Sequence, residues 1–150
     1  MKDLNKKAYI FGSIFTLSNK LQAIGDKMDP NITVKQWLLL ACISKFEESP
    51  TISEIADAIG NSRQNAKKMA AILEREGFLT LKKDKNDARI LRVSLTEKCK
   101  KYFENRDNQE LEFIDLLFNG FDSDLVQGLY KGILKLSENI VEMENIYDKK

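Results

Sequence analysis

The chain has 150 residues, a net charge of +1 and 31% charged residues, which fits one soluble globular domain that needs no disulfide or metal to fold. No apolar run approaches the ~20 residues of a membrane span, and no signal segment opens the chain, so we expect a cytoplasmic protein without a membrane partner. There is no histidine, no glycine-rich phosphate loop and no nucleophile motif. We therefore expect no enzymatic activity, no metal and no cofactor.

The charges are distributed unevenly along the chain. Residues 61–106 contain thirteen basic and six acidic residues, a net charge of +7, whereas residues 107–150 contain four basic and ten acidic residues, a net charge of −6. A positive field concentrated on one stretch attracts a polyanion. We expect residues 61–106 to contact nucleic acid and the acidic tail to point elsewhere.

A first helix is predicted over residues 4–28, ended by the breaker Asp29-Pro30-Asn31. Phe11 and Phe15 form one apolar stripe along it. A second stripe has the alternating spacing of a heptad-like seam. Its residues include Ile10, Ile14, Leu17 and Leu21.

A second helix is predicted over residues 33–48, because Thr33 and Gln36 have the capping-box spacing and Ser49-Pro50 stops it. The segment 37–43 is apolar nearly all round, which is typical of a buried central helix. Cys42 within it is interpreted as a small core residue.

Residues 51–77 are predicted to form two short helices joined by a turn at Gly60, where a left-handed backbone favours glycine. Thr51 and Glu54 have capping-box spacing, and Ser62 can cap the second helix. The apolar residues of both helices fall on one face each. This pattern is typical of a helix-turn-helix, although two amphipathic helices around a glycine can also serve packing alone.

The outer face of the second helix is basic and rich in amides. Arginine suits guanine O6 and N7, glutamine or asparagine suits adenine, and lysines suit phosphates. We expect this face to enter a major groove of double-stranded DNA. Its residues are Ser62, Arg63, Gln64, Asn65, Lys67 and Lys68.

After Gly77 the apolar period changes from 3.6 residues to 2. Leu79 and Leu81 alternate with polar residues, as do the apolar residues of segment 91–95, and a polar turn lies between them. This pattern predicts an antiparallel hairpin, called the wing. Its lysines are expected to contact phosphates, with a merely solvated loop as the alternative. These lysines are Lys82, Lys83 and Lys85.

Two further helices are predicted, one over residues 97–119 capped by Thr96, and a last one capped by Asp122 or Ser123. The last helix carries a row of apolar residues at strictly alternating spacings of three and four residues, a heptad-like seam. Together with the first helix, this seam should form a homodimer interface, although it could pack intramolecularly. Its residues include Val126, Leu129, Ile133, Leu136, Ile140 and Met143. The predicted fold class is mainly α with a small β hairpin: one domain, 1–150, with a winged helix-turn-helix at 33–96 and dimerisation helices at 1–32 and 97–150.

Four segments also carry a family pattern. They are Ser53-Glu54-Ile55-Ala56 with Gly60, Leu73-Glu74-Arg75-Glu76-Gly77-Phe78-Leu79, Asp87-Ala88-Arg89, and Val93-Ser94-Leu95-Thr96-Glu97-Lys98. In this order they resemble the MarR (multiple-antibiotic-resistance repressor) family of bacterial transcription regulators over essentially the whole chain. The resemblance implies an obligate homodimer with intertwined terminal helices. The two-fold symmetry of such a dimer predicts a pseudo-palindromic operator, at which we expect a repressor that a small-molecule effector releases.

The resemblance also implies roles for single residues. Asp87 and Arg89 match the Asp-x-Arg wing motif, whose members shape the wing and help to bind DNA. Ala88 stands where many relatives carry a second arginine, and Lys85 could supply a phosphate contact instead. A cleft for a small aromatic or amphipathic effector is implied as well. Trp37, Leu40 and Phe46 could line it, with core packing as the alternative.

Two alternatives follow from other features. Cys99 lies in the first turn of a helix beside Lys98 and Lys100, which favours its thiolate, so a thiol-based redox-sensing regulator of the same fold is one alternative. The other is a winged-helix protein-interaction module without DNA binding. That module would have no need of the basic outer face.

Overall fold

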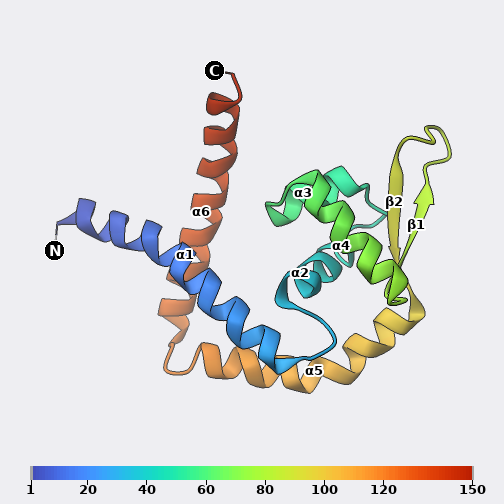
Figure 1. Ribbon diagram of the computed structural model, residues 1–150. Helices are drawn as coiled ribbons and strands as arrows, with labels where there is room; N and C mark the ends of the chain where they lie inside the picture. Colours follow the sequence, from blue (N-terminus) through green and yellow to red (C-terminus); the bar gives the residue numbers. More distant parts are fainter. Residues whose placement is uncertain (1, 150) are drawn as a thin grey trace. The chain divides into compact units, whose positions relative to one another are not determined.

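The computed structural model describes residues 2–149, along which six helices and one two-stranded antiparallel hairpin follow one another (Figure 1). The chain divides into two compact units, Met1–Glu104 and Asn105–Lys150. The elements are α1 (Asp3–Met28), α2 (Val34–Ile43), α3 (Ile52–Ile59), α4 (Arg63–Arg75), β1 (Leu79–Lys83), β2 (Leu91–Leu95), α5 (Glu97–Leu117) and α6 (Ser123–Tyr147). The predicted fold class is confirmed.

Helix α1 approaches the start of α2 closely at Gly25. A Cβ built at Gly25 would overlap the Cγ2 atom of Val34, so only glycine fits there. One residue further along α1, the Asp26 carboxylate accepts a hydrogen bond from the Val34 amide at 2.8 Å. These two contacts fix the end of α1 against the first turn of α2.

Helix α2 begins as predicted but ends earlier. Thr33 and Gln36 form the complete capping box, yet the helix stops at Ile43 rather than at residue 48. The Ser44 hydroxyl donates to the Ala41 carbonyl at 2.7 Å, and the next two amides bond three residues back instead of four. Because such bonds tighten the last turn, the α-helix does not propagate.

The predicted helix-turn-helix is present as α3 and α4. Thr51 and Glu54 form a complete capping box at the start of α3, and Gly60 ends it in the left-handed conformation with φ 68°. The Ser62 hydroxyl caps α4 by accepting from the Asn65 amide at 3.1 Å. Local sequence chemistry therefore sets both helix starts and the turn between them.

The hairpin also matches the prediction, with Leu79 opposite Leu95 and Lys83 opposite Leu91 in its antiparallel register. Val93, at its centre, is fully buried. Its amide donates to the Pro50 carbonyl at 2.8 Å, which fastens β2 to the segment before α3. A hairpin alone is marginal in water, so this attachment and the buried face stabilise it.

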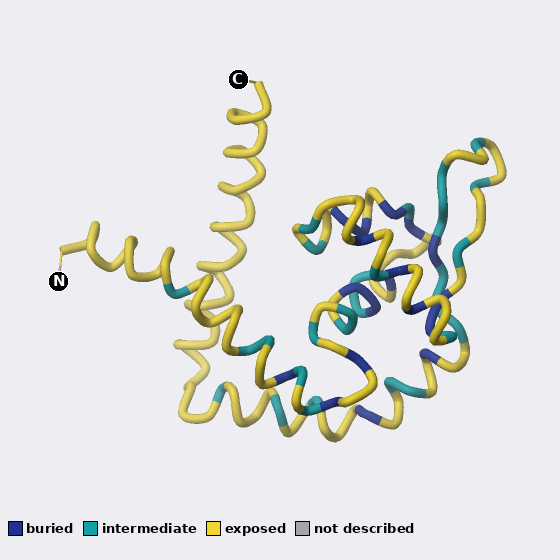
Figure 2. Tube along the Cα trace, viewed as in Figure 1, coloured by how far each residue is buried: buried dark blue, intermediate teal, exposed yellow. Residues whose placement is uncertain are grey.

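The core of the first unit lies among α2, α3, α4 and the hairpin, where the tube of Figure 2 is darkest. It includes Leu39, Leu40, Ile55, Ala66, Ala70, Leu73, Leu79 and Val93. The inward faces of α3 and α4 are thus the ones that their apolar periodicity predicted. Their polar faces are left for solvent.

In the second unit, α6 begins at its predicted cap, because Asp122 accepts a hydrogen bond from the Leu125 amide at 2.8 Å. No residue of α6 between Ser123 and Tyr147 is buried. Its predicted seam residues, from Val126 to Met143, remain between 39% and 54% exposed. On α1 of the first unit, Ile10, Ile14 and Leu17 are exposed to a similar degree. Among residues 2–149, no helix has the length and apolar character that crossing a bilayer requires.

Candidate nucleic-acid interface

The outer face of α4 is fully available to solvent. All six predicted side chains on it, from Ser62 to Lys68, are exposed, whereas Ala66 between them is buried. Ser62 and Asn65 are partly engaged, since Ser62 caps the helix and the Asn65 side-chain amide reaches Asn61 Oδ1 at 3.4 Å. The face therefore presents three cationic side chains, Arg63, Lys67 and Lys68, beside fixed polar groups, an arrangement suited to a polyanion.

The wing carries a second group of exposed cations, Lys82 and Lys83 at the end of β1 and Lys85 and Arg89 in the loop. The Arg89 guanidinium makes a two-pronged contact with the Asp87 carboxylate, with both N···O distances at 3.0 Å. The hydrogen bonds from Arg89 lower the pKa of Asp87, so the pair stays charged at neutral pH. Arg89 nevertheless remains 90% exposed and can still meet a ligand.

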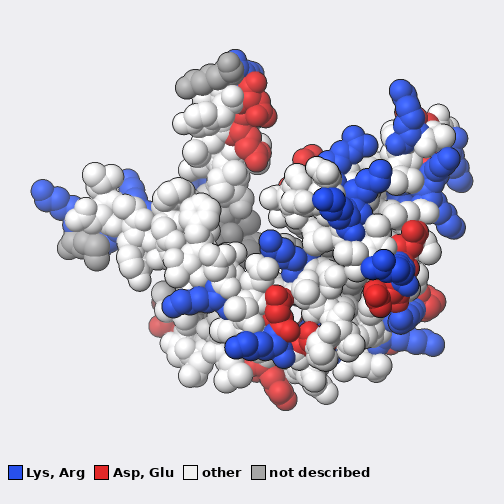
Figure 3. Space-filling model, in the orientation of Figure 1, with Lys and Arg blue, Asp and Glu red and all other residues white. Residues whose placement is uncertain are grey.

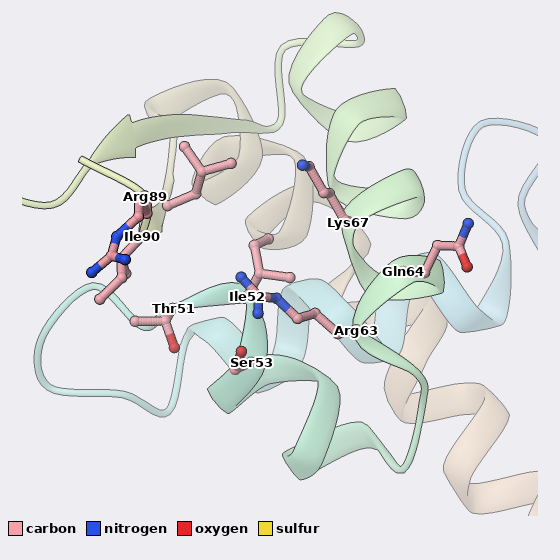
Figure 4. Close-up of a pocket in the computed structure, with 9 residues that line it drawn as sticks. Thr51, Ile52, Ser53, Arg63, Gln64, Lys67, Arg89 and Ile90 are labelled. Carbon is pink, nitrogen blue, oxygen red and sulfur yellow. The ribbon is translucent and has the colours of Figure 1, made fainter. Parts of the chain in front are cut away.

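The helix and the wing meet at one hollow of about 630 Å³. Figure 4 shows the side chains of Arg63 and Lys67 reaching from α4 toward the space that Arg89 borders from the wing. Thr51, Ile52, Ser53, Gln64, Ile90 and Leu91 complete its lining. In the first unit, lysine and arginine side chains gather over this helix-turn-helix and hairpin (Figure 3). Four of the predicted residues thus come together, namely Arg63, Gln64, Lys67 and Arg89.

The three wing lysines lie elsewhere. Lys82, Lys83 and Lys85 line a separate hollow of about 530 Å³ together with Arg92 and Asp84. In the sequence, Arg92 is a polar residue of the alternating segment 91–95 and was not predicted as a functional residue. Its Nε atom contacts Asp84 Oδ1 at 2.5 Å and its Nη1 atom donates to the Ser49 carbonyl at 2.9 Å. Asp84 lies two residues beyond Lys82, the cross-strand partner of Arg92, and this diagonal aspartate–arginine pair was the signal that could have identified it.

Of the three residues predicted for the effector cleft, Leu40 follows the core-packing alternative, because its side chain is fully buried. Trp37 packs partly buried against the same core, and Phe46 is 36% exposed. An apolar hollow of about 550 Å³ lies instead between α1, α2 and the α3–α4 turn. Its apolar lining is Ile14, Leu17, Leu21, Val34, Leu38, Ile59 and Met69.

The surroundings of Cys99 do not favour the predicted thiolate. The Cys99 side chain is fully buried, and burial raises its pKa to about 11. Desolvation therefore outweighs the helix N-terminus and the neighbouring lysines, which the sequence suggested would favour the thiolate. Cys42 is partly buried, and desolvation raises its pKa too.

Comparisons with known proteins agree with this geometry. The model of the MarR family matches residues 32–91. The transcriptional repressor MprA of Escherichia coli K12 is 34% identical over 85 residues, which are 55% of this chain and 48% of that protein, so the chain spans about half the length of the relative.

Two solved structures extend the likeness to most of the chain. A MarR transcriptional regulator from Methanosarcina mazei Go1 has a TM-score of 0.80 at 25% identity, covering 91% of this chain and 99% of that one. BpsR of Bordetella bronchiseptica, whose DNA binding is described as regulated by 6-hydroxynicotinic acid, has a TM-score of 0.75 at 15% identity, covering 86% and 98%. At that identity the second likeness supports the fold alone.

Proposed function

We propose that this chain, which is similar to MarR-family regulators over residues 32–91 and to the repressor MprA over 85 residues, is a homodimeric repressor of a pseudo-palindromic DNA operator. The observation that carries the proposal is the hollow shared by α4 and the wing. Arg63 and Lys67 of α4, the recognition helix, and Arg89 of the wing border one exposed cationic space. A recognition helix and a neighbouring wing on one surface suit a major groove and the backbone beside it.

The roles of the individual side chains follow from their chemistry. Arg63 reads a guanine, and Gln64 or Asn65 reads an adenine, because their planar donors match those base edges. Lys67, Lys68 and the wing lysines neutralise phosphates, which gives affinity and salt dependence rather than sequence choice. Because we propose that the protein acts on DNA, we expect it in the cytoplasm.

The homodimer is supported by the apolar faces that the single chain leaves uncovered. The seam of α6 from Val126 to Met143 and that of α1 from Ile10 to Leu17 are about half exposed. Uncovered apolar rows at heptad spacing are stabilised by a second helix. A two-fold dimer presents two recognition helices, so the half-sites are separated by about 34–36 Å, one turn of B-DNA.

Release from DNA by a small aromatic or amphipathic effector is the regulation that we propose. BpsR is described as regulated by such a molecule. The apolar hollow beside α1 has a volume within the usual range for ligand sites. Ile14, Leu17 and Leu21 belong both to this hollow and to the predicted dimer seam. A ligand there would contact the interface that sets the separation of the recognition helices.

The test is selection of duplexes from a random library by the purified protein, followed by titration of the selected duplex at several salt concentrations. We expect an inverted repeat to be enriched and its affinity to fall steeply with salt. The same duplex with one half-site scrambled is the control. No enriched sequence, or an affinity indifferent to salt, would refute the proposal and favour a protein-interaction module.

A further inference from the structure

The Arg92 side chain connects the wing to the segment that enters the helix-turn-helix. Its Nη1 atom donates to the Ser49 carbonyl at 2.9 Å, and its Nε atom contacts Asp84 Oδ1 at 2.5 Å. The backbone of Arg92 also contacts this segment, because Arg92 forms an isolated antiparallel bridge with Thr51. Ser49 and Ser94 also share a hydrogen bond between their hydroxyls at 2.6 Å. Strand β2 is thus anchored along residues 49–51.

Asp84 extends this connection into the wing loop. Its Oδ2 atom accepts hydrogen bonds from the amides of Asn86 at 3.0 Å and Asp87 at 3.1 Å. The Arg92 hydrogen bond is the largest cause that lowers the pKa of Asp84, so the carboxylate is charged and a strong acceptor. The Asp84 side chain is only 13% exposed, and its partner Arg92 is 39% exposed.

Asp87 completes the path to the wing cation. Its Oδ1 atom accepts hydrogen bonds from both the amide and the Nε atom of Arg89, each at 3.0 Å. An unbroken series of polar contacts therefore runs from the Ser49 carbonyl through Arg92, Asp84 and Asp87 to Arg89. Arg89 borders the hollow that Arg63 also lines.

We propose that Arg92 is a positioning residue that holds the wing loop, and through it Arg89, beside the recognition helix. The inference rests on the proposed DNA binding and deepens it: the wing contributes affinity only while Arg92 keeps the loop in place. A loop that is free before binding must lose its conformational freedom on the DNA, and this weakens the complex. The planar fork of arginine bonds two acceptors in fixed directions, which a lysine ammonium cannot reproduce.

The test is a set of double-mutant cycles measured as affinity for the selected duplex. Arg92→Ala and Arg92→Lys are each expected to weaken binding by about five- to tenfold, the cost of ordering a few side chains. In an Arg89→Ala background, Arg92→Ala should have a clearly smaller effect, because the main cation that it positions is absent and only the wing lysines remain. In an Arg63→Ala background it should keep its full effect, because independent contacts are additive.

Several outcomes would overturn the proposal. If Arg92→Lys binds like the original protein, the charge alone acts, as in a direct phosphate contact. If Arg92→Ala has the same effect in the Arg89→Ala and Arg63→Ala backgrounds, Arg92 does not act through the wing. Circular dichroism and the melting temperature of each variant check that the fold is kept.

Hydrogen exchange of the unbound protein separates this inference from the proposed function. Arg92→Ala should accelerate exchange of the Asn86, Asp87 and Arg89 amides while leaving the amide of Leu73 in α4 unchanged. Unchanged protection in the wing loop would reject the positioning role even if DNA binds. Conversely, faster exchange in a protein that binds no duplex would support the role of Arg92 and reject the proposed function alone.

Discussion

The carboxylate of Glu74, in the last turn of the recognition helix, accepts a hydrogen bond from the backbone amide of Leu81 at 2.8 Å. This contact ties β1 to α4, as Arg92 ties β2 to the segment before α3. The wing is therefore held at both strands by charged side chains, while the Leu/Val face beneath it supplies the burial. A two-stranded hairpin needs such support to keep one position.

We predict that Glu74→Ala lowers the free energy of unfolding by about 0.5–1.5 kcal/mol, the net value of one hydrogen bond. Glu74→Gln should lose less, because its amide oxygen can still accept from Leu81. Urea denaturation measures both, and Glu76→Ala is the control, since the Glu76 carboxylate is not part of this contact. Equal losses for Glu74→Ala and Glu76→Ala would show that the contact stabilises nothing.

The recognition helix should separate base contacts from phosphate contacts. Arg63→Ala is expected to cost about 1–3 kcal/mol on the selected duplex and much less on random DNA, whereas Lys67→Ala should weaken both alike and reduce the salt slope by about 1. Fluorescence anisotropy over a range of salt concentrations measures both effects. If Arg63→Ala weakens both duplexes equally, Arg63 does not read a base.

The seam of α6 should control the association state. Ile133→Glu places a charge in the exposed apolar row and should shift the protein toward monomers in sedimentation velocity, because burying an unpaired carboxylate is costly. Gln127→Glu adds the same charge on the opposite, polar side of the helix and should leave the dimer intact. A dimer that survives Ile133→Glu would place the interface elsewhere.

Two exposed glycines should respond oppositely to alanine. Gly60 has φ 68°, so Gly60→Ala is expected to destabilise by about 1–2 kcal/mol through its left-handed backbone alone. Gly12 lies inside α1 with ordinary helical geometry, and Gly12→Ala should be neutral or stabilise by up to about 1 kcal/mol. A Cβ would meet no neighbouring atom at either position, so sterics do not interfere. Melting temperatures measure both, and equal shifts would contradict this explanation.

Cys99 should be unreactive while the protein is folded. Burial raises its pKa from 9.0 to about 11, so the folded state keeps the proton over a pH range in which the unfolded state loses it. Its contribution to stability is therefore complete below pH 9 and falls as the pH rises toward 11. We expect thiol reagents at pH 8 to modify Cys99 only after denaturation. Rapid modification of Cys99 in the folded protein would restore the redox alternative.

The features that the sequence predicted well depend on neighbours close along the chain. Thr51 and Glu54 lie three residues apart, and their capping box forms as the spacing indicates. The two apolar periods likewise gave the helix-turn-helix and the hairpin, because each period places one face inward whatever the partner is.

The features that were missed depend on distant contacts or on burial. Arg92 meets Ser49 across 43 residues, which no local pattern indicates. The thiolate at Cys99 was expected from its neighbours in sequence, whereas burial in the surrounding core determines its pKa. Helix α2 ends early because the Ser44 hydroxyl and two tightened turns compete with helical hydrogen bonds. The apolar residues 37–43 gave no indication of this early end.

If the proposed function holds, two copies of this chain place two recognition helices on one duplex. The measurement is sedimentation equilibrium of the protein with the selected duplex and with the same duplex carrying one scrambled half-site. We expect two chains on the intact duplex and an affinity at least about tenfold weaker on the single half-site, a loss of about 1.4 kcal/mol or more. One chain per duplex, with equal affinity for both, would refute the homodimeric operator complex.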